Sequence, residues 1–210
     1  MSEAQQQLST SEAAQPTRNA RFISPVLAAV RDATKSQHHV LDKSMPLANP
    51  DANWADYVHH LQLLTSWLLP LEKWLSRFDD GPQGKEAPGF ISYTDIIHAD
   101  LGEAFIPVSD LWQNALQQPQ STDAAYRWGI CYVIEGSQLG GEFLYKRLAN
   151  RLSPHPLKYL QCKQAGRWPE FLKVMAREVN TQEHINNACE GAVYAFDALL
   201  LLLRAQEDIL

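Results

Sequence analysis

One stretch of the chain indicates a helix with an unusually bare face: Tyr126-Arg-Trp-Gly-Ile-Cys-Tyr-Val-Ile-Glu-Gly-Ser-Gln-Leu-Gly-Gly-Glu-Phe-Leu-Tyr-Lys-Arg-Leu148. Glycine inside a helix costs about 1 kcal/mol relative to alanine. Gly129, Gly136 and Gly140 stand seven and four residues apart, so they fall on one helical face. This spacing is typical of two helices that pack closely, and equally of a helix that admits a flat or bulky ligand.

The rest of the chain follows the same helical pattern. Strand signals are almost absent, whereas apolar spacings of three and four residues recur throughout. Ser24-Pro25 predicts a helix that begins there and runs to about residue 43. A second begins near Asn53, and Pro70 should kink or divide it. Further helices are expected over residues 94–104, part of 107–120, 123–152, 156–164, 168–179 and 182–206, with a loop at 79–89.

Composition limits the classes of protein that fit. The 210 residues are 45% hydrophobic and 20% charged, which suits one globular domain, assigned here to residues 21–210. A net charge of -6 gives no basic field for nucleic acid. Three cysteines without a CxxC pair argue against a disulfide framework and favour the reducing cytoplasm.

The two ends of the chain carry no expected membrane segment. Residues 1–20 are rich in Gln, Ala, Ser and Thr, so we expect a disordered tail, and no apolar stretch marks a signal peptide. The apolar run at residues 199–203 is far too short to span a bilayer. We interpret it as the buried end of the last helix, and expect no membrane partner.

A histidine and an arginine share one face of the first helix. His38 lies on its apolar stripe, either as a core histidine satisfied by a hydrogen bond or as a metal ligand. Arg31 stands seven residues earlier, about 10 Å away along the axis. That separation suits a porphyrin with its iron on the histidine and a propionate on the guanidinium. Alternatively, Arg31 is a solvated surface residue.

Other candidate residues give weaker signals. The pair His59-His60 is typical of a solvated face, although His60 could approach a ligand pocket. A carboxylate-bridged di-iron bundle requires two Glu-x-x-His motifs, and the chain has none. Cys131 on the glycine-rich helix is by default a small buried thiol. No flavin, nicotinamide or P-loop motif occurs, so any electrons must come from another protein.

Two motifs together resemble those of the heme oxygenases. The first is Leu-Ala-Ala-Val-Arg31-Asp-Ala-Thr-Lys-Ser-Gln-His38-His-Val-Leu-Asp42, which is similar to the family's first helix. The second begins at Tyr132-Val-Ile-Glu-Gly136-Ser-Gln-Leu-Gly140 and resembles the kinked distal helix in its bacterial form. The resemblance covers about residues 22–207 and is nearest to the type encoded beside bacterial phytochromes. It implies an all-α, single-domain helical bundle with a kinked, glycine-rich distal helix.

The resemblance also implies roles for individual residues. It makes His38 the proximal ligand of the heme iron, places Gly136 and Gly140 over the distal porphyrin face, and puts Arg31 and Tyr132 on a propionate.

Two more residues depend on the same resemblance. Ser137 takes the place of the distal aspartate of the animal enzymes, so the distal water network must be held differently. Phe196 is expected to line the pocket.

The activity implied is the cleavage of heme to biliverdin, Fe(II) and CO. Heme b would be both substrate and cofactor, with O2 as co-substrate and a ferredoxin or reductase as external electron donor. The phytochrome association implies cleavage at the α position and transfer of the biliverdin to a bacteriophytochrome. The alternatives are a non-enzymatic heme carrier or sensor on the same fold, and a heme-free relative such as a thiaminase-like or quinone-cofactor enzyme.

Overall fold

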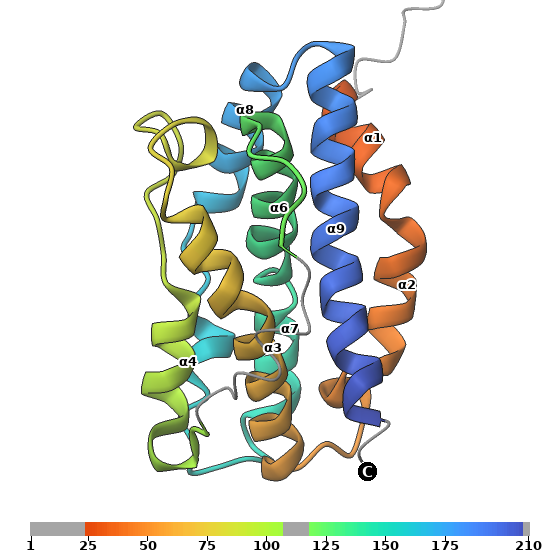
Figure 1. The fold of residues 1–210 in the computed structure, drawn as a ribbon. Helices are drawn as coiled ribbons and strands as arrows, with labels where there is room; N and C mark the ends of the chain where they lie inside the picture. The colour runs from red at the N-terminus through yellow and green to blue at the C-terminus, as the bar shows by residue number, and fades with distance from the viewer. Residues whose placement is uncertain (1–23, 107–117, 208–210) are drawn as a thin grey trace, which may run out of the picture.

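The computed structural model describes residues 24–106 and 118–207, and within them it contains helices but no strands, so the all-α prediction is confirmed (Figure 1). The α-helices are α1 (Pro25–Ala33), α2 (Lys35–Ser44), α3 (Trp54–Leu75), α4 (Tyr93–Leu101), α6 (Ala124–Ser137), α7 (Gly141–Leu148), α8 (Arg167–Glu178) and α9 (Gln182–Glu207). Four short 3-10 helices connect them: η1 (Pro46–Ala48), η2 (Gly81–Gln83), η3 (Gly102–Ala104) and η4 (Lys158–Gln161). The predicted tail at 1–20 and residues 107–117 of the predicted 107–120 segment lie outside the described residues.

The centre of the bundle is the close packing of α6 against α9. A Cβ atom on Gly129 would lie 1.9 Å from the carbonyl oxygen of Ala188, and one on Gly191 would lie 2.0 Å from that of Tyr126. The two helices therefore meet backbone to backbone, with fully buried alanines such as Ala192 between them. For Gly129, the helix-packing interpretation is correct.

Helix α9 packs against both halves of the bundle. In Figure 1 it lies between α6 and the α1–α2 pair, and it contacts all three helices. Seven residues were predicted on its inner side, and six of them are buried: Ile185, Ala188, Ala192, Phe196, Leu199 and Leu200. The seventh, Cys189, is half-buried. The apolar run at the end of the chain is thus largely core, as expected from its sequence.

The first predicted helix is two helices. It breaks at Thr34, whose buried hydroxyl donates a 2.8 Å hydrogen bond to the carbonyl of Val30 one turn earlier. A threonine that bonds back to this carbonyl competes with the helical hydrogen bonds and bends the helix. Helix α2, which carries His38, therefore begins anew at Lys35.

Pro70 was expected to kink or divide helix α3, and it does not divide it: α3 continues through Pro70 to Leu75. Its start is fixed by a capping box: the Asn53 side chain accepts hydrogen bonds from two backbone amides, and the Asp56 carboxylate accepts one from the Asn53 amide. Most of the helix is buried, including Trp67 and Leu68. This burial outweighs the one backbone hydrogen bond that proline removes.

The glycine-rich helix is interrupted. Helix α6 ends at Ser137 and α7 begins at Gly141, with a turn over residues 138–140, so the continuous helix predicted over 123–152 is two shorter ones. A Cβ atom on Gly141 would lie 2.9 Å from the carbonyl oxygen of Leu160, because α7 starts close against η4. We call residues 136–140, which precede this contact, the glycine segment.

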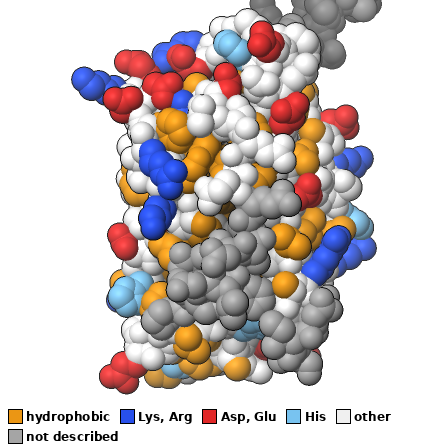
Figure 2. Space-filling view, in the orientation of Figure 1, with side chains coloured by type: hydrophobic (Ala, Val, Ile, Leu, Met, Phe, Trp, Pro, Cys, Tyr) orange, Lys and Arg blue, Asp and Glu red, His pale blue; other side chains and the backbone are white. Residues whose placement is uncertain are grey.

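The surface carries charges of both signs. On the face in Figure 2, acidic and basic side chains alternate, with apolar side chains between them and no continuous basic patch among the described residues. None of the helices in the described ranges has both the length and the apolar content needed to cross a bilayer.

Candidate functional site

His38 projects from α2 rather than into the core. Its side chain is 64% exposed, and its Nδ1 atom lies 2.9 Å from a carboxylate oxygen of Asp42, one turn further on. The core-histidine interpretation is therefore wrong. With the proton on Nδ1 shared with Asp42, the lone pair of Nε2 is free to bind a metal, and metal-binding histidines commonly have such a carboxylate partner.

Phe196 of α9 lies beside this histidine. The two ring centroids are 6.0 Å apart with the planes tilted by 56°. Gln37 Nε2, next to the histidine in the chain, donates a 3.4 Å hydrogen bond to the Asp197 carboxylate of α9. Two residues that the sequence analysis assigned to one pocket thus lie together, on different helices.

Within the described residues, no other backbone covers Gly136 or Gly140 of the glycine segment. A Cβ atom on Gly136 would lie 3.5 Å from the Trp168 ring, an ordinary contact. One on Gly140 would meet only the Ser137 carbonyl, at 3.8 Å, among the described residues. Helix packing explains Gly129, but it does not explain these two glycines. Their bare backbone leaves room for a ligand.

Large apolar side chains are exposed on both helices that carry candidate residues. Leu139 in the glycine segment is 40% exposed, and Phe143 just after it is 68% exposed. Val40 of α2, two residues after His38, is 42% exposed. Exposed apolar groups beside candidate ligands are typical of a binding surface for an apolar molecule.

The α1–α2 and α6–α7 helices are tied together at both ends. At one end, Arg147 of α7 donates a hydrogen bond to the Leu47 carbonyl just after α2, and Arg151 donates one of 2.7 Å to the Pro50 carbonyl. At the other end, α1 contacts α8, whose Trp168 ring lies 5.3 Å from the Tyr132 ring of α6. These contacts, together with the packing of α1, α2 and α6 against α9, fix the distance between α2, which carries His38, and the glycine segment.

The Ser137 hydroxyl forms two hydrogen bonds and can still accept a third. Its hydroxyl donates to the Ile134 carbonyl at 2.7 Å and accepts from Gln138 Nε2 at 3.0 Å. The same amide nitrogen donates to the Tyr159 hydroxyl at 3.0 Å, and burial raises the pKa of that phenol. Because the hydrogen of Ser137 is already committed, its remaining lone pair is available to accept a hydrogen bond.

Arg31 and Tyr132 are not brought into contact. Arg31 is exposed and forms no hydrogen bond or ion pair within the described part of the chain. Tyr132 is half-buried against Trp168. Their shared role at a propionate remains a prediction.

Two further sequence interpretations have different outcomes. His60 is buried rather than solvated, and desolvation, assisted by the neighbouring charge of His59, lowers its pKa to about 3. It is therefore neutral and lies inside the bundle. Cys131 is a thiol whose pKa burial raises to about 12, as expected for an unreactive core cysteine.

A buried ion pair joins the helices behind the glycine segment. Arg167 of α8 binds both carboxylate oxygens of Glu135, with Nε and Nη2 at 2.7 and 2.6 Å. The Tyr93 hydroxyl of α4 donates to the same carboxylate at 3.1 Å. The side chains of Arg167 and Glu135 are only 12% and 11% exposed. If one of them were removed, water would therefore solvate the remaining charge only poorly.

We therefore expect Arg167→Met to destabilise the protein by about 3 kcal/mol, since it leaves the Glu135 charge buried and unpaired. Lys146→Met is the matched control, because the ion pair of Lys146 with Glu142 is largely exposed and adds little to stability. Urea unfolding measures both values. Equal losses in the two variants would contradict the assignment.

The described arrangement is an all-α bundle in which an exposed histidine and an uncovered glycine segment lie on helices tied together at both ends. A curated protein of Xanthomonas campestris pv. campestris (strain 8004), named heme oxygenase, is 35% identical to this chain over 86 residues. The match covers 39% of this chain and 52% of the relative, so the chain spans about half the length of the curated protein it matches. No family model matches the chain. The similarity supports a relationship to heme oxygenases.

Proposed function

We propose that this protein is a heme oxygenase, which cleaves heme to biliverdin, Fe(II) and CO with O2 and external electrons. One observation carries the proposal: His38 is exposed with its Nδ1 held by Asp42, on a helix tied to the uncovered glycine segment. The partial similarity to a protein named heme oxygenase supports the same function.

The residues present fit a heme. A single histidine would suffice to hold a heme iron, because the porphyrin itself would supply four nitrogen ligands. The bare backbone at Gly136 and Gly140 and the exposed side chain of Phe143 suit a flat apolar ring. The guanidinium of Arg31, which has no partner among the described residues, would be available for a propionate. When bound, heme supplies the iron at which O2 reacts, and its own ring is the substrate.

The side chains of this protein then orient the substrate and its surrounding water. Asp42 fixes the tautomer and direction of the His38 ring and makes its Nε2 a better donor. Ser137, with one acceptor lone pair free, orients a water molecule at the glycine segment, which is the task of an aspartate in the animal enzymes. Gln138, only 7% exposed, holds the Ser137 hydroxyl in place.

Several finer features belong to the same proposal. Residues 21–210 form the catalytic domain, preceded by a tail at 1–20, in a cytoplasmic protein. Cleavage occurs at the α position, and a ferredoxin or reductase supplies the electrons. The biliverdin then passes to a bacteriophytochrome.

Titration with hemin tests the binding half of the proposal. We expect saturation at one hemin per chain and the Soret absorption of a histidine-ligated heme. Hemin should also quench tryptophan fluorescence, since Trp168 lies against Gly136. Non-saturating absorption, equal to that of hemin with an unrelated protein, would overturn the proposal.

A further inference from the structure

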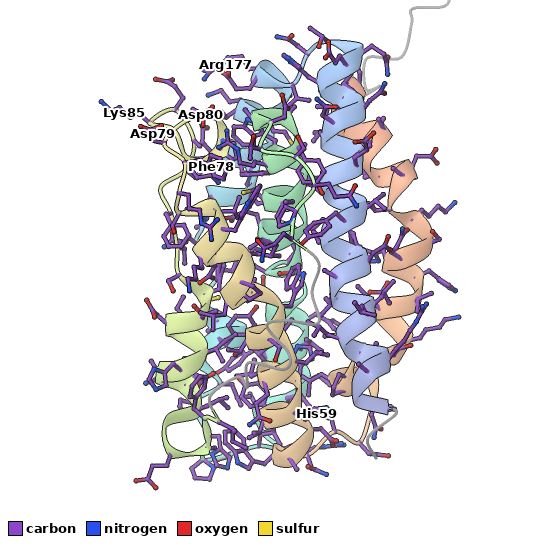
Figure 3. All side chains as sticks on the ribbon, viewed as in Figure 1. His59, Phe78, Asp79, Asp80, Lys85 and Arg177 are labelled. Carbon is purple, nitrogen blue, oxygen red and sulfur yellow. The ribbon has the colours of Figure 1, made fainter. Side chains whose placement is uncertain are left out.

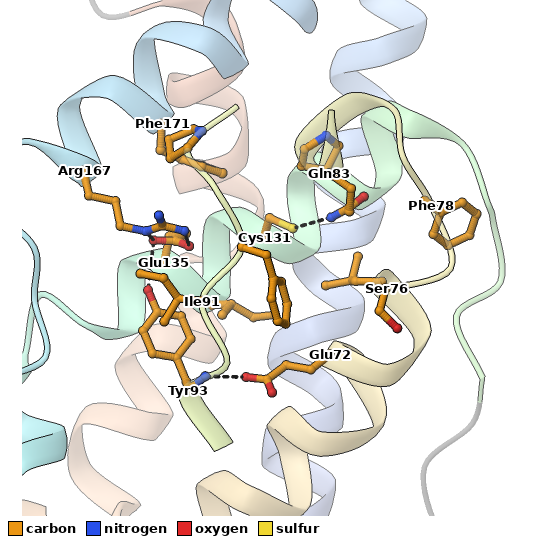
Figure 4. A pocket seen from close by; sticks show the side chains of 15 residues that line it. Glu72, Ser76, Phe78, Gln83, Ile91, Tyr93, Cys131, Glu135, Arg167 and Phe171 are labelled. Atoms are coloured by element: carbon orange, nitrogen blue, oxygen red, sulfur yellow. Dashed lines mark hydrogen bonds and ion pairs between the residues drawn. The ribbon is translucent and has the colours of Figure 1, made fainter. Parts of the chain in front are cut away.

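A cavity lies beside α6, with a lining that does not include His38. Its volume is about 310 Å³, it is partly open to solvent, and it is lined by residues of α3, α4, α6, α8 and the loop over residues 76–91 (Figure 4). This volume falls within the range of sites for small molecules. Neither His38 nor any residue of the glycine segment lines it.

The walls are mainly apolar and include three phenylalanine rings, two from the loop over residues 76–91 and one from α8. Phe171 of α8 packs against Trp128, with ring centroids 5.1 Å apart. Phe90 lines the cavity while 64% exposed, so part of its ring is open to solvent. Phe78 is capped by the guanidinium of Arg127, 4.1 Å from the ring centroid.

The loop that closes the cavity is held in place. Figure 3 shows Phe78, Asp80 and Lys85 together at the end of the bundle where this loop turns back. Arg127 is 2% exposed and binds Asp80 at 2.6 Å and Gln83 at 2.7 Å. The cavity therefore has a fixed wall on its loop side.

Every charged group on the lining already has partners within the protein. Glu135 and Arg167 form the ion pair described above. Glu72 accepts four hydrogen bonds from residues 92–94 at the start of α4, the shortest being 2.6 Å from the Thr94 hydroxyl. A charged ligand would lose its hydration without gaining a free counter-charge, which is strongly unfavourable.

We propose that this cavity is a second binding site, for a small uncharged aromatic molecule of about one fused two-ring system. Flat rings pack favourably against the phenylalanine walls, and the paired polar groups exclude anions and cations. The proposal does not depend on heme binding. Cys131, Ile134 and Glu135 line the cavity directly before Gly136 in the chain, so an occupant would press on α6 behind the glycine segment.

Indole tests the proposal, with indole-3-acetate and tryptamine as anionic and cationic counterparts. In ¹⁵N-labelled protein, with and without bound hemin, we expect indole to cause saturable amide shifts centred on Cys131, Ile134 and Phe171. The two charged compounds should cause no such shifts at the same concentration. Binding of either as tight as that of indole would overturn the proposal, as would shifts centred on His38 that hemin abolishes.

Matched variants give a second test of the site. Ile91→Trp fills the cavity and should weaken indole binding at least about tenfold, equivalent to about 1.4 kcal/mol. Ile96→Trp, on α4 but not on the lining of the cavity, should change the affinity for indole by less than about twofold relative to the wild type. Phe90→Ala, at an exposed position where folding is tolerant, should weaken binding about threefold to tenfold. Unchanged binding in Phe90→Ala, or equal losses in the two tryptophan variants, would overturn the proposal.

Discussion

His38→Ala should remove the iron ligand and with it the histidine-type Soret spectrum and heme turnover. The reason is geometric: His38 is the exposed imidazole whose Nδ1 is already held by Asp42. We expect at least about a hundredfold loss of turnover, because removing the ligand itself should cost more than the roughly 10- to 100-fold lost with a hydrogen-bond partner of a ligand. Absorption spectroscopy of the hemin complex and the rate of heme consumption measure the two effects.

The neighbouring His39→Ala is the matched control, because that side chain is also exposed but lies on another part of the helix surface. Its spectrum and turnover should equal those of the wild type. Added imidazole should restore the Soret band of His38→Ala by occupying the vacated space. A His38→Ala variant with the wild-type spectrum would show that another residue binds the iron.

Gly129→Ala should destabilise the protein by about 3 kcal/mol, although it adds a single methyl group. That methyl would lie 1.9 Å from the Ala188 carbonyl oxygen, so α6 and α9 must separate. Urea unfolding measures the free energy of unfolding. A loss below about 0.5 kcal/mol would contradict the backbone-to-backbone packing of these helices.

Gly140→Ala is the matched variant with the opposite expectation. Its methyl group would come no closer than 3.8 Å to a described atom, so its stability should stay within about 1 kcal/mol of the wild type. Hemin affinity should fall, however, because the methyl occupies the space proposed for the porphyrin. Stability and hemin binding thus separate the two glycines, which share one motif but have different roles.

The sequence predicted much of the helical architecture. Features that depend only on neighbouring residues were predicted correctly. Ser24-Pro25 begins α1, and the buried face of α9 follows its apolar spacing. It was not predictable that α3 continues through Pro70, because the burial that stabilises this helix depends on helices distant in the sequence. The break at Thr34 was not predictable either, because it depends on whether the Thr34 hydroxyl donates to the Val30 carbonyl or to another acceptor.

The candidate site was predictable only in part. The motifs identified His38 and the glycines, but not that Gly129 packs against α9 while Gly140 is open, since this depends on Ala188 far along the chain. Gln138 lay within the quoted motif, whereas no signal pointed to Tyr159, its hydrogen-bond partner from η4. Contacts of this kind arise only when separate helices are brought together.

The most direct test is a turnover of the purified hemin complex under O2 with a reductant such as ascorbate, followed by absorption spectroscopy and chromatography of the extracted pigment. A heme oxygenase should lose its Soret band and yield biliverdin, with the α isomer as the expected product. A complex that binds hemin tightly but keeps its Soret band and yields no bilin would contradict the proposed activity and identify a heme carrier or sensor instead.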